Sequence, residues 1–169
     1  LCAGAAVPAS LWDASRTLLP HGRLHSPYGA TEALPVASVS VDEVQPGALH
    51  GACVGRPLQE IELKIIALTD AALSTLVEAR QLRPGEIGEI IVRGPVVTKA
   101  YDGQPDATAM AKIRGEAGLW HRMGDCGYLD SDGRLWFCGR KAERVETGAA
   151  TLHTEPCEQV FRRHPRARR

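Results

Sequence analysis

The stretch Ser26-Pro27-Tyr28-Gly29-Ala30-Thr31-Glu32 combines a turn with a flat ring, a hydroxyl and a carboxylate. Its proline and glycine indicate that the chain turns here, which sets Thr31 and Glu32 side by side. Such a turn can place Thr31 against a phosphate oxygen and Glu32 on hydrated Mg²⁺, because this ion prefers one or two carboxylates plus phosphate and water oxygens. Tyr28 offers its ring face to a base. The same residues are also typical of a turn that enters a helix, with Thr31 as N-cap and Glu32 in the first turn.

The composition is that of an ordinary globular chain. Its 169 residues suit about one domain or parts of two. Lys plus Arg and Asp plus Glu both number 20, so no bulk charge points to nucleic acid or to an anionic membrane. Five arginines gather in the last eight residues, and a solvated helix end explains them more simply than a nucleic-acid site: Arg162, Arg163, Arg166, Arg168 and Arg169.

The cysteines and the hydropathy pattern favour a cytoplasmic protein. Five cysteines are scattered singly, without a CxxC pair, which is typical of reduced thiols: Cys2, Cys53, Cys126, Cys138 and Cys157. No apolar run approaches about 18 residues, and no basic-then-apolar leader opens the chain, so we expect neither a spanning helix nor a secretory signal. The chain begins at Leu1 without Met, as expected for a piece cut from something longer.

The first thirty residues predict one α/β repeat. A buried strand over residues 1–3 is followed by a turn of small residues and by a helix over residues 8–19. Pro8 suits the start of that helix, and Pro20 stops it. A second strand is expected over residues 23–28.

The middle of the chain predicts mostly β structure. Alternating apolar and polar residues indicate strands at four places, namely residues 36–41, 60–68, 87–93 and 119–122. A loop is expected over residues 47–55, and helices over residues 69–83, 106–113 and 155–164. The turn residues Asp130-Ser131-Asp132-Gly133 separate two apolar runs and predict a β-hairpin.

Four local motifs follow one another along the chain: Gly4-Ala5-Ala6; Tyr28-Gly29-Ala30-Thr31-Glu32; Gly85-Glu86-Ile87-Gly88-Glu89-Ile90 with Arg93-Gly94 and Tyr101; and Met123-Gly124-Asp125 with Gly139-Arg140. In this order and spacing they resemble the acyl-adenylate-forming, or AMP-binding, enzyme superfamily. That superfamily contains acyl-CoA synthetases, peptide-synthetase adenylation domains and luciferases. The resemblance covers about residues 1–165. It assigns no chemistry to the third motif, whose glycines and proline turn the strands of a small barrel.

The resemblance implies an α/β fold class. It predicts the end of an α/β subdomain, a distorted β-barrel subdomain and the start of a small C-terminal domain. Residues 1–139 would be the C-terminal part of the large AMP-binding domain, with half of the ATP and Mg²⁺ site. Residues 140–169 would be the hinge and the truncated start of the small domain. The family's phosphate-binding loop and C-terminal lysine are missing, so we expect this piece alone not to adenylate.

The resemblance also implies roles for single residues. Tyr28, with Gly29 beside it, resembles the residue that stacks on adenine. Thr31 resembles the phosphate-contacting hydroxyl and Glu32 the Mg²⁺ carboxylate, and together they would offset charge at the α-phosphate. Small residues would leave a slot for adenine against the backbone, although a close-packed turn needs them equally: Gly4, Ala5 and Ala6.

Asp125 resembles the carboxylate that accepts both ribose hydroxyls, as acidic residues do in dinucleotide folds, and Arg140 resembles a second ribose contact. If Leu129 pairs with Arg134, Arg140 becomes a diagonal neighbour of Asp125 on one face, roughly 7–8 Å away. A three-residue loop with a bulge at Gly133 would shift the register by one and turn Arg140 to the other face. A surface salt bridge to Glu143 or Glu146 is the simpler alternative for Arg140.

The hinge departs from the family pattern. The family usually carries Asp or Lys where this sequence has Ala142, beside Lys141. The following residues 144–149 also differ from the segment that lines the family's CoA tunnel. This difference puts the thioester-forming step in doubt.

Among the histidines, which lack metal-ligand spacing, His121 stands out because it lies two residues before Met123.

A closer resemblance is to the ligases of long-chain olefin biosynthesis. It rests on YGATEALPV (28–36), TKAYDGQPDATAMAKI (98–113), RMGDCGYLD (122–130) and GRLWFCGRKAERVET (133–147). It implies ATP- and Mg²⁺-dependent adenylation of a long-chain 3-hydroxy fatty acid, whose own hydroxyl then displaces AMP to form a β-lactone. It admits other olefin-pathway enzymes as partners. The alternatives are a fatty-acyl-CoA ligase, which would also use CoA, and a non-catalytic nucleotide-binding module.

Overall fold

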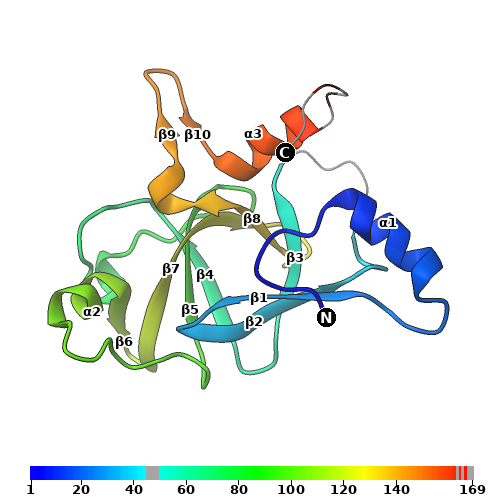
Figure 1. Ribbon diagram of the computed structural model, residues 1–169. Helices are drawn as coiled ribbons and strands as arrows, with labels where there is room; N and C mark the ends of the chain where they lie inside the picture. Colours follow the sequence, from blue (N-terminus) through cyan, green and yellow to red (C-terminus); the bar gives the residue numbers. More distant parts are fainter. Residues whose placement is uncertain (45–49, 163, 165, 167–169) are drawn as a thin grey trace.

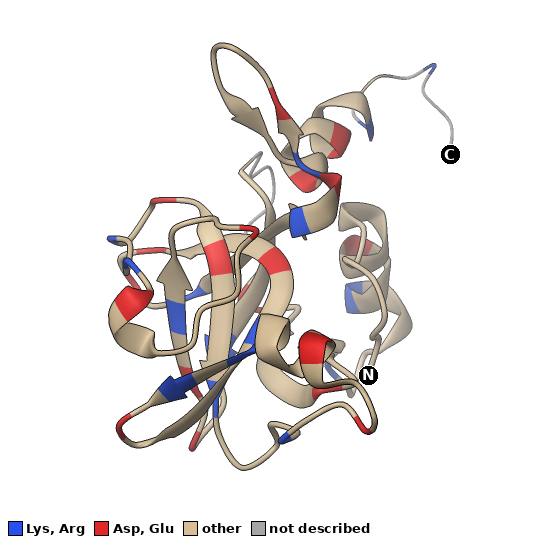
Figure 2. Ribbon diagram, turned by 90° about the vertical axis from the view of Figure 1, so that its left-hand side faces the viewer, with Lys and Arg blue, Asp and Glu red and all other residues tan. Residues whose placement is uncertain are grey.

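A computed structural model describes residues 1–44, 50–162, 164 and 166. A strongly curved antiparallel sheet fills the centre of the molecule (Figure 1). Helix α1 packs through Trp12 against Val39 of β2 and Val41, α2 lies beside β6, and α3 stands over β8 together with a small separate hairpin. Figure 2 shows acidic and basic residues interspersed over the ribbon, in keeping with their equal numbers in the sequence, 20 each.

The elements follow in chain order as α1 (Ala9–Leu18), β1 (His25–Ala30), β2 (Ala33–Ser40), β3 (Ala52–Pro57), β4 (Glu62–Ile66), β5 (Gly88–Arg93), α2 (Pro105–Ala111), β6 (Lys112–Gly115), β7 (Gly118–Leu129), β8 (Leu135–Arg140), β9 (Val145–Glu146), β10 (Thr151–Leu152) and α3 (Thr154–Arg162). Single 3₁₀ turns lie at η1 (Leu76–Glu78) and η2 (Lys141–Glu143). The eight-stranded sheet has the order β1-β2-β3-β8-β7-β5-β4, and β6 pairs with β7 off this path.

Strand β5 lies at the core because both of its faces are covered. Ile90 and Val92 pack into one apolar cluster with Leu135 and Met123, whereas Ile91 packs on the opposite side. This division follows from the two-residue repeat of a strand, which sends neighbouring side chains to opposite faces. The uninterrupted run Ile90-Ile91-Val92 therefore places an apolar side chain on each face of β5, which explains why this strand is central.

The prediction of a buried strand over residues 1–3 was wrong. Leu1 is almost fully exposed, and the backbone N–H of Cys2 makes a single hydrogen bond to the carbonyl of His25 (2.9 Å). Strand β1 pairs antiparallel with β2 instead, so the start of the chain does not form a parallel repeat. The fold class remains α/β.

Two further predictions from composition were wrong. Residues 69–83 contain good helix formers, yet only η1 is helical. The segment instead runs back along β4, where the backbone N–H of Leu82 donates to the carbonyl of Ile65 (2.9 Å). The loop predicted over residues 47–55 includes the start of β3, which pairs with β8 and β2. Residues 47–49 of that loop lie outside the described residues.

The C-terminal helix α3 leaves two large apolar side chains, Val160 and Phe161, exposed. It meets the sheet through other residues. The side chain of Gln159 accepts a hydrogen bond from the backbone N–H of Gly51 (3.3 Å), and the hydroxyl of Thr154 lies where a Cβ on Gly139 would be. Among the described residues, no helix is long and apolar enough to cross a membrane.

Candidate nucleotide-binding site

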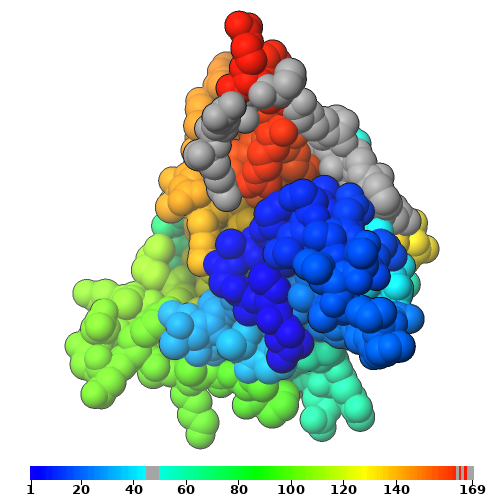
Figure 3. All heavy atoms as spheres, turned by 45° about the vertical axis from the view of Figure 1, so that its right-hand side comes forward, coloured from blue at the N-terminus to red at the C-terminus, as the bar shows by residue number. Residues whose placement is uncertain are grey.

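A cavity of about 520 Å³ opens where the N-terminal residues, helices α1 and α3, and strands β1, β3 and β8 meet, with Asp125 of β7 on its wall. In Figure 3 the N-terminal residues and α1 (blue) lie directly below α3 (orange-red) on this face. The structure brings all seven residues predicted to bind nucleotide to the wall of this one cavity, namely Gly4, Ala5, Ala6, Tyr28, Gly29, Asp125 and Arg140. The sequence separates the first of these from the last by most of the chain.

Asp125 lies at the centre of the polar part of the wall and is only 2% exposed. Its Oδ2 accepts a hydrogen bond from the hydroxyl of Tyr28 (2.6 Å), and its Oδ1 accepts one from Nη1 of Arg140 (2.8 Å). Burial raises the pKa of the Asp125 carboxyl, while Tyr28 and Arg140 act to lower it. Burial, and then the nearby Asp125 charge, raise the pKa of Tyr28 well above its usual value.

Arg140 reaches Asp125 because of two irregularities in the β7–β8 hairpin. Gly133 has a φ of +74° in the turn, and Leu129 pairs with Leu135, which is the shifted register of the bulged alternative. A second irregularity between Cys126 and Gly127 then adds a residue to β8, so that Arg140 pairs directly with Asp125. The first alternative was right that Arg140 shares a face with Asp125 but wrong to make it a diagonal neighbour, and the second was wrong about the face, since neither allowed for this second bulge.

The ring of Tyr28 lies against the ring of Phe137, with centroids 6.2 Å apart and planes inclined by 46°. Gly29 follows at a point of close approach, because a Cβ there would lie 2.5 Å from the carbonyl oxygen of Ala33. The glycine therefore permits the tight β1–β2 pairing that holds Tyr28 on the cavity wall. The aromatic wall at Phe137 was not predicted, because Phe137 resembles any other apolar residue of a strand.

Thr31 and Glu32 connect β1 to β2, since Ala30 pairs with Ala33 across them. The alternative of a turn that enters a helix was wrong, because a strand follows. Unlike Tyr28 and Gly29, the two residues do not line the cavity. They form the hairpin tip between Ala30 and Ala33.

The Glu32 turn is held by the segment that precedes α2. The backbone carbonyl of Glu32 accepts from the N–H of Thr98, and its Oε1 accepts from the hydroxyl of Tyr101, both at 2.8 Å. The Tyr101 hydrogen bond lowers the pKa of the Glu32 carboxyl, against an opposing effect of burial. Tyr101 lies 69 residues from Glu32 along the chain, and its contact with the carboxylate was not predicted.

His121 lies near this turn but is buried, with 3% exposure. Its Nδ1 is 3.3 Å from the carbonyl oxygen of Ala111, which can only accept, so Nδ1 carries the proton. Burial, followed by the charge of Lys112, lowers the pKa of His121 to about 4. His121 is therefore a neutral core residue near neutral pH.

We expect this histidine to make the protein less stable in acid. The unfolded chain protonates His121 near pH 6.5 and the folded chain near pH 4, so the unfolded state binds more protons between these values. Stability present above about pH 6.5 should fall by about 2 kcal/mol as pH approaches 4. Urea unfolding of His121→Gln should lose this part of the pH dependence, whereas the exposed-site control His21→Gln should keep it. Parallel curves for wild type and His121→Gln would contradict the assignment.

The predicted hinge residues differ in environment. Ala142 is exposed in η2, whereas the side chain of Lys141 turns inward and its Nζ lies 3.1 Å from Oε2 of Glu89. Among the described residues, the ion pair of Arg140 is with Asp125 and not with Glu143 or Glu146, and Glu146 is instead bound by Arg144.

Helices α1 and α3 also contribute to the cavity wall, through Trp12 and Gln159 among others. Their amphipathic patterns carried no signal for this role.

Comparison with known proteins assigns the chain to a family. The model of the family described as AMP-binding enzyme matches residues 1–102. Olefin β-lactone synthetase from Stenotrophomonas maltophilia is 48% identical over 94% of this chain and 31% of its own length. The enzyme of the same name from Xanthomonas campestris is 46% identical over 99% of this chain and 32% of its own length. The chain thus spans about a third of the length of these curated relatives.

A solved structure supports the same fold. O-succinylbenzoate coenzyme A synthetase (MenE) from Bacillus subtilis, in complex with ATP and magnesium ion, aligns with a TM-score of 0.76 and 27% identity. The alignment covers 96% of this chain and 30% of that chain. The described chain therefore has the architecture of one part of an adenylate-forming enzyme.

Proposed function

The chain belongs to the AMP-binding enzyme family, and on that premise we propose that it forms the adenine- and ribose-binding part of an ATP-dependent acid-adenylating enzyme. The substrate we propose is a long-chain 3-hydroxy fatty acid, by similarity to the olefin β-lactone synthetases. The observation that carries the proposal is the cavity itself, in which Asp125 stands between Tyr28 and Arg140 with the small-residue turn on the same wall.

The wall suits the parts of a nucleotide. The turn at Gly4 carries little side-chain bulk, so a flat adenine can lie against the backbone there and meet the ring of Tyr28 by offset packing. The Asp125 carboxylate can accept from ribose hydroxyls, because each of its oxygens has a second lone pair beside the one that its protein partner uses. Arg140 is half exposed and can donate to the same sugar.

The Glu32 carboxylate can coordinate a magnesium ion that is bound to a nucleotide. Its Oε1 is held by Tyr101, and the residue is only partly buried, so the carboxylate can be reached from solvent. Within the part of the chain that the structure describes, no three His, Cys, Asp or Glu side chains gather as a metal-binding group. A single partly exposed carboxylate matches the preference of Mg²⁺ for few protein ligands plus phosphate and water oxygens. The ion would supply charge stabilisation at the α-phosphate, next to the hydroxyl of Thr31.

The proposed reaction has two steps. A carboxylate oxygen of the acid bonds to the α-phosphorus of ATP, and the bond to pyrophosphate breaks, which leaves an acyl-AMP. The 3-hydroxyl oxygen then bonds to the acyl carbon, the hydroxyl loses its proton, and AMP leaves with the bonding electrons. A CoA ligase would instead transfer the acyl group to the CoA thiol. The departure from the family pattern at Ala142 and the following residues favours the lactone, and release of AMP without added CoA separates the two.

We also propose that residues 1–139 belong to the large domain and residues 140–169 to a smaller one. Exposure of Val160 and Phe161 supports the division, because neither side chain packs into the core of the sheet. Limited proteolysis that cuts first near residue 140 would agree with this division.

The free state of all five cysteines supports a cytoplasmic location. Other olefin-pathway enzymes are proposed as partners on the similarity alone.

Asp125→Asn tests the nucleotide site in the full-length enzyme, meaning an enzyme of the relatives' length that contains this chain. An amide has one acceptor oxygen, so it cannot serve Tyr28, Arg140 and two ribose hydroxyls as a carboxylate can. Loss of a hydrogen bond to a charged group costs roughly 1.5–3 kcal/mol, which corresponds to a roughly ten- to hundredfold higher KM for ATP.

The matched control is Asp132→Asn, an exposed carboxylate in the turn of the same hairpin. It should leave the KM for ATP unchanged. Calorimetry with AMP gives the affinity directly, and circular dichroism checks the fold. A folded Asp125→Asn enzyme with wild-type ATP affinity would show that Asp125 is a hairpin residue and not a ribose ligand.

A further inference from the structure

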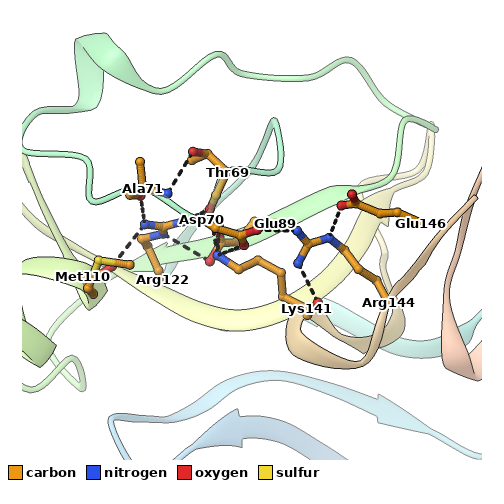
Figure 4. A network of polar contacts seen from close by, with 9 residues as sticks. All are labelled: Thr69, Asp70, Ala71, Glu89, Met110, Arg122, Lys141, Arg144 and Glu146. Carbon is orange, nitrogen blue, oxygen red and sulfur yellow. Dashed lines mark hydrogen bonds and ion pairs between the residues drawn. The ribbon is translucent and has the colours of Figure 1, made fainter.

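A cluster of charged side chains lies beside the cavity, where β5, β7 and the segment after β8 meet (Figure 4). Glu89 on β5 and Arg122 on β7 form its buried centre, with side chains only 1% and 3% exposed. Nε of Arg122 donates to Oε1 of Glu89 (3.2 Å), and Nη2 donates to Oε2 (2.7 Å). This two-point contact fixes the carboxylate in one orientation.

Arg122 has no donor to spare. A guanidinium carries five N–H groups, and the three that do not bind Glu89 donate to backbone carbonyls. These are the carbonyls of Thr69 (2.6 Å), Ala71 (2.7 Å) and Met110 (3.1 Å). Arg122 therefore ties the loop at residues 69–71 to Glu89 and presents the oxygens of both toward the end of β8.

Lys141 enters the group of oxygens that Arg122 has arranged. Its Nζ donates to the carbonyl of Thr69 (2.9 Å) and to Oε2 of Glu89 (3.1 Å), and it lies 3.8 Å from Oδ1 of Asp70. We call these three residues, Glu89, Thr69 and Asp70, the acceptor socket. Arg144 adds a second clamp, because it donates both to Asp70 (2.6 Å) and to the carbonyl of Lys141 (2.9 Å).

The socket lies one residue away from the nucleotide cavity. Arg140 is the last residue of β8 and has extended backbone angles, φ −71° and ψ 139°. Neighbouring side chains on extended backbone point to opposite sides, so Arg140 faces Asp125 while Lys141 faces the socket. Beyond Arg140 the pairing of β8 with β7 ends. The ammonium in the socket is thus the first side-chain anchor that holds the strand end in place.

We propose that Lys141 is a positioning residue for the nucleotide site: seated in the acceptor socket, it fixes the end of β8 so that Arg140 stays on Asp125 and available to the ribose. The inference rests on the proposed function of the cavity. Lys141 itself is not among the residues that line the cavity. It acts only through its neighbour, so its removal should affect nucleotide affinity when Arg140 is present and not when it is absent.

Lys141 can be removed without unfolding the protein. Glu89 keeps its two-point contact with Arg122, so no buried charge is left without a partner. Asp70 is exposed and keeps Arg144. Lys141→Met retains most of the apolar stem and removes only the ammonium, while Lys141→Arg supplies a cation to the same oxygens.

The test is a double-mutant cycle in the full-length enzyme, with AMP affinity and the KM and kcat for ATP as readouts. Lys141→Met should weaken AMP binding and raise the KM for ATP on the order of tenfold, with kcat nearly unchanged. In the Arg140→Met background the same change should have no further effect. Lys141→Arg should restore most of the affinity, and the exposed control Lys99→Met should match wild type. Equal effects of Lys141→Met with and without Arg140 would overturn the proposal.

Amide hydrogen exchange of the 169-residue chain gives an answer that does not depend on nucleotide binding. Lys141→Met should speed exchange in residues 140–146 and leave β5 and the β7 segment around Arg122 protected. Unchanged exchange in residues 140–146 would overturn the positioning role even if the enzyme binds ATP. Faster exchange there, in an enzyme that binds no adenine nucleotide, would contradict the proposed function of the cavity while the anchoring role stands.

Discussion

Arg122→Met should lower the free energy of unfolding by about 3–5 kcal/mol, because it leaves a buried carboxylate without its permanent partner. Glu89 would keep only Lys141, which reaches it from the surface. The carbonyls of Ala71 and Met110 would lose the donor that the structure gives them. These carbonyls lie on exposed residues and can turn to water, so most of the loss should come from the buried Glu89 carboxylate.

Urea unfolding of the 169-residue chain measures this effect, with Arg83→Met as the matched control. The Arg83 side chain is 91% exposed and lies 4.0 Å from the Glu86 carboxylate, so its loss should cost less than about 1 kcal/mol. Replacing both Arg122 and Glu89 by Met should recover part of the lost stability, because an apolar pair leaves no isolated charge. A loss below about 1 kcal/mol for Arg122→Met would mean that water enters this cluster and screens it.

Glu32→Gln should lower kcat for acyl-AMP formation on the order of a hundredfold, with little change in ATP affinity. A metal ion at a phosphoryl oxygen supplies several kcal/mol of stabilisation as charge moves in the transition state, and each 1.36 kcal/mol corresponds to about tenfold in rate. The amide keeps an oxygen that can accept from Tyr101, so the hairpin turn should keep its shape. The loss should therefore be catalytic and not structural.

Pyrophosphate release by the full-length enzyme at several magnesium concentrations checks this prediction. Glu32→Gln should need more magnesium to reach its lower maximum rate, and Glu116→Gln, an exposed carboxylate elsewhere, should behave as wild type. Asp125→Asn should differ in kind, because it raises the KM for ATP. Small and equal changes in kcat and KM for both carboxylates would identify Glu32 as a turn residue and Asp125 as a hairpin residue.

Local patterns predicted most of the strands, and the family resemblance named seven of the residues that line the cavity. The alternation of apolar residues around Ile90 predicts β5, and the turn residues around Gly133 predict the β7–β8 hairpin. Both predictions depend on residues within a few positions of one another, because side chains along a strand repeat every two residues. The motifs around Tyr28 and Asp125 carried the family resemblance, and the structure brings those residues to one wall.

Helical composition at residues 69–83 was misleading for a tertiary reason. The segment contains Ala, Leu and Glu residues, whose intrinsic preference for helix is weak and readily overridden. In the folded chain its backbone is used instead by β4, through hydrogen bonds such as that from Leu82 to Ile65, and by the contact of its Thr69 carbonyl with Arg122. A packed neighbour that lies 53 residues away decides the outcome.

The exact site geometry lay beyond any local pattern. A single added residue in a strand exchanges its two faces, and the extra residue in β8, opposite the step from Cys126 to Gly127, is what turns Arg140 toward Asp125. Glu32 and Tyr101, which are in contact, are separated by 69 positions in the sequence. Glu89 and Lys141 are separated by 52 positions. Such contacts depend on the summed register of every strand between the partners. The sequence therefore identifies which residue types are candidates for the site. The distances between their side chains are set only when the strands of the sheet have paired.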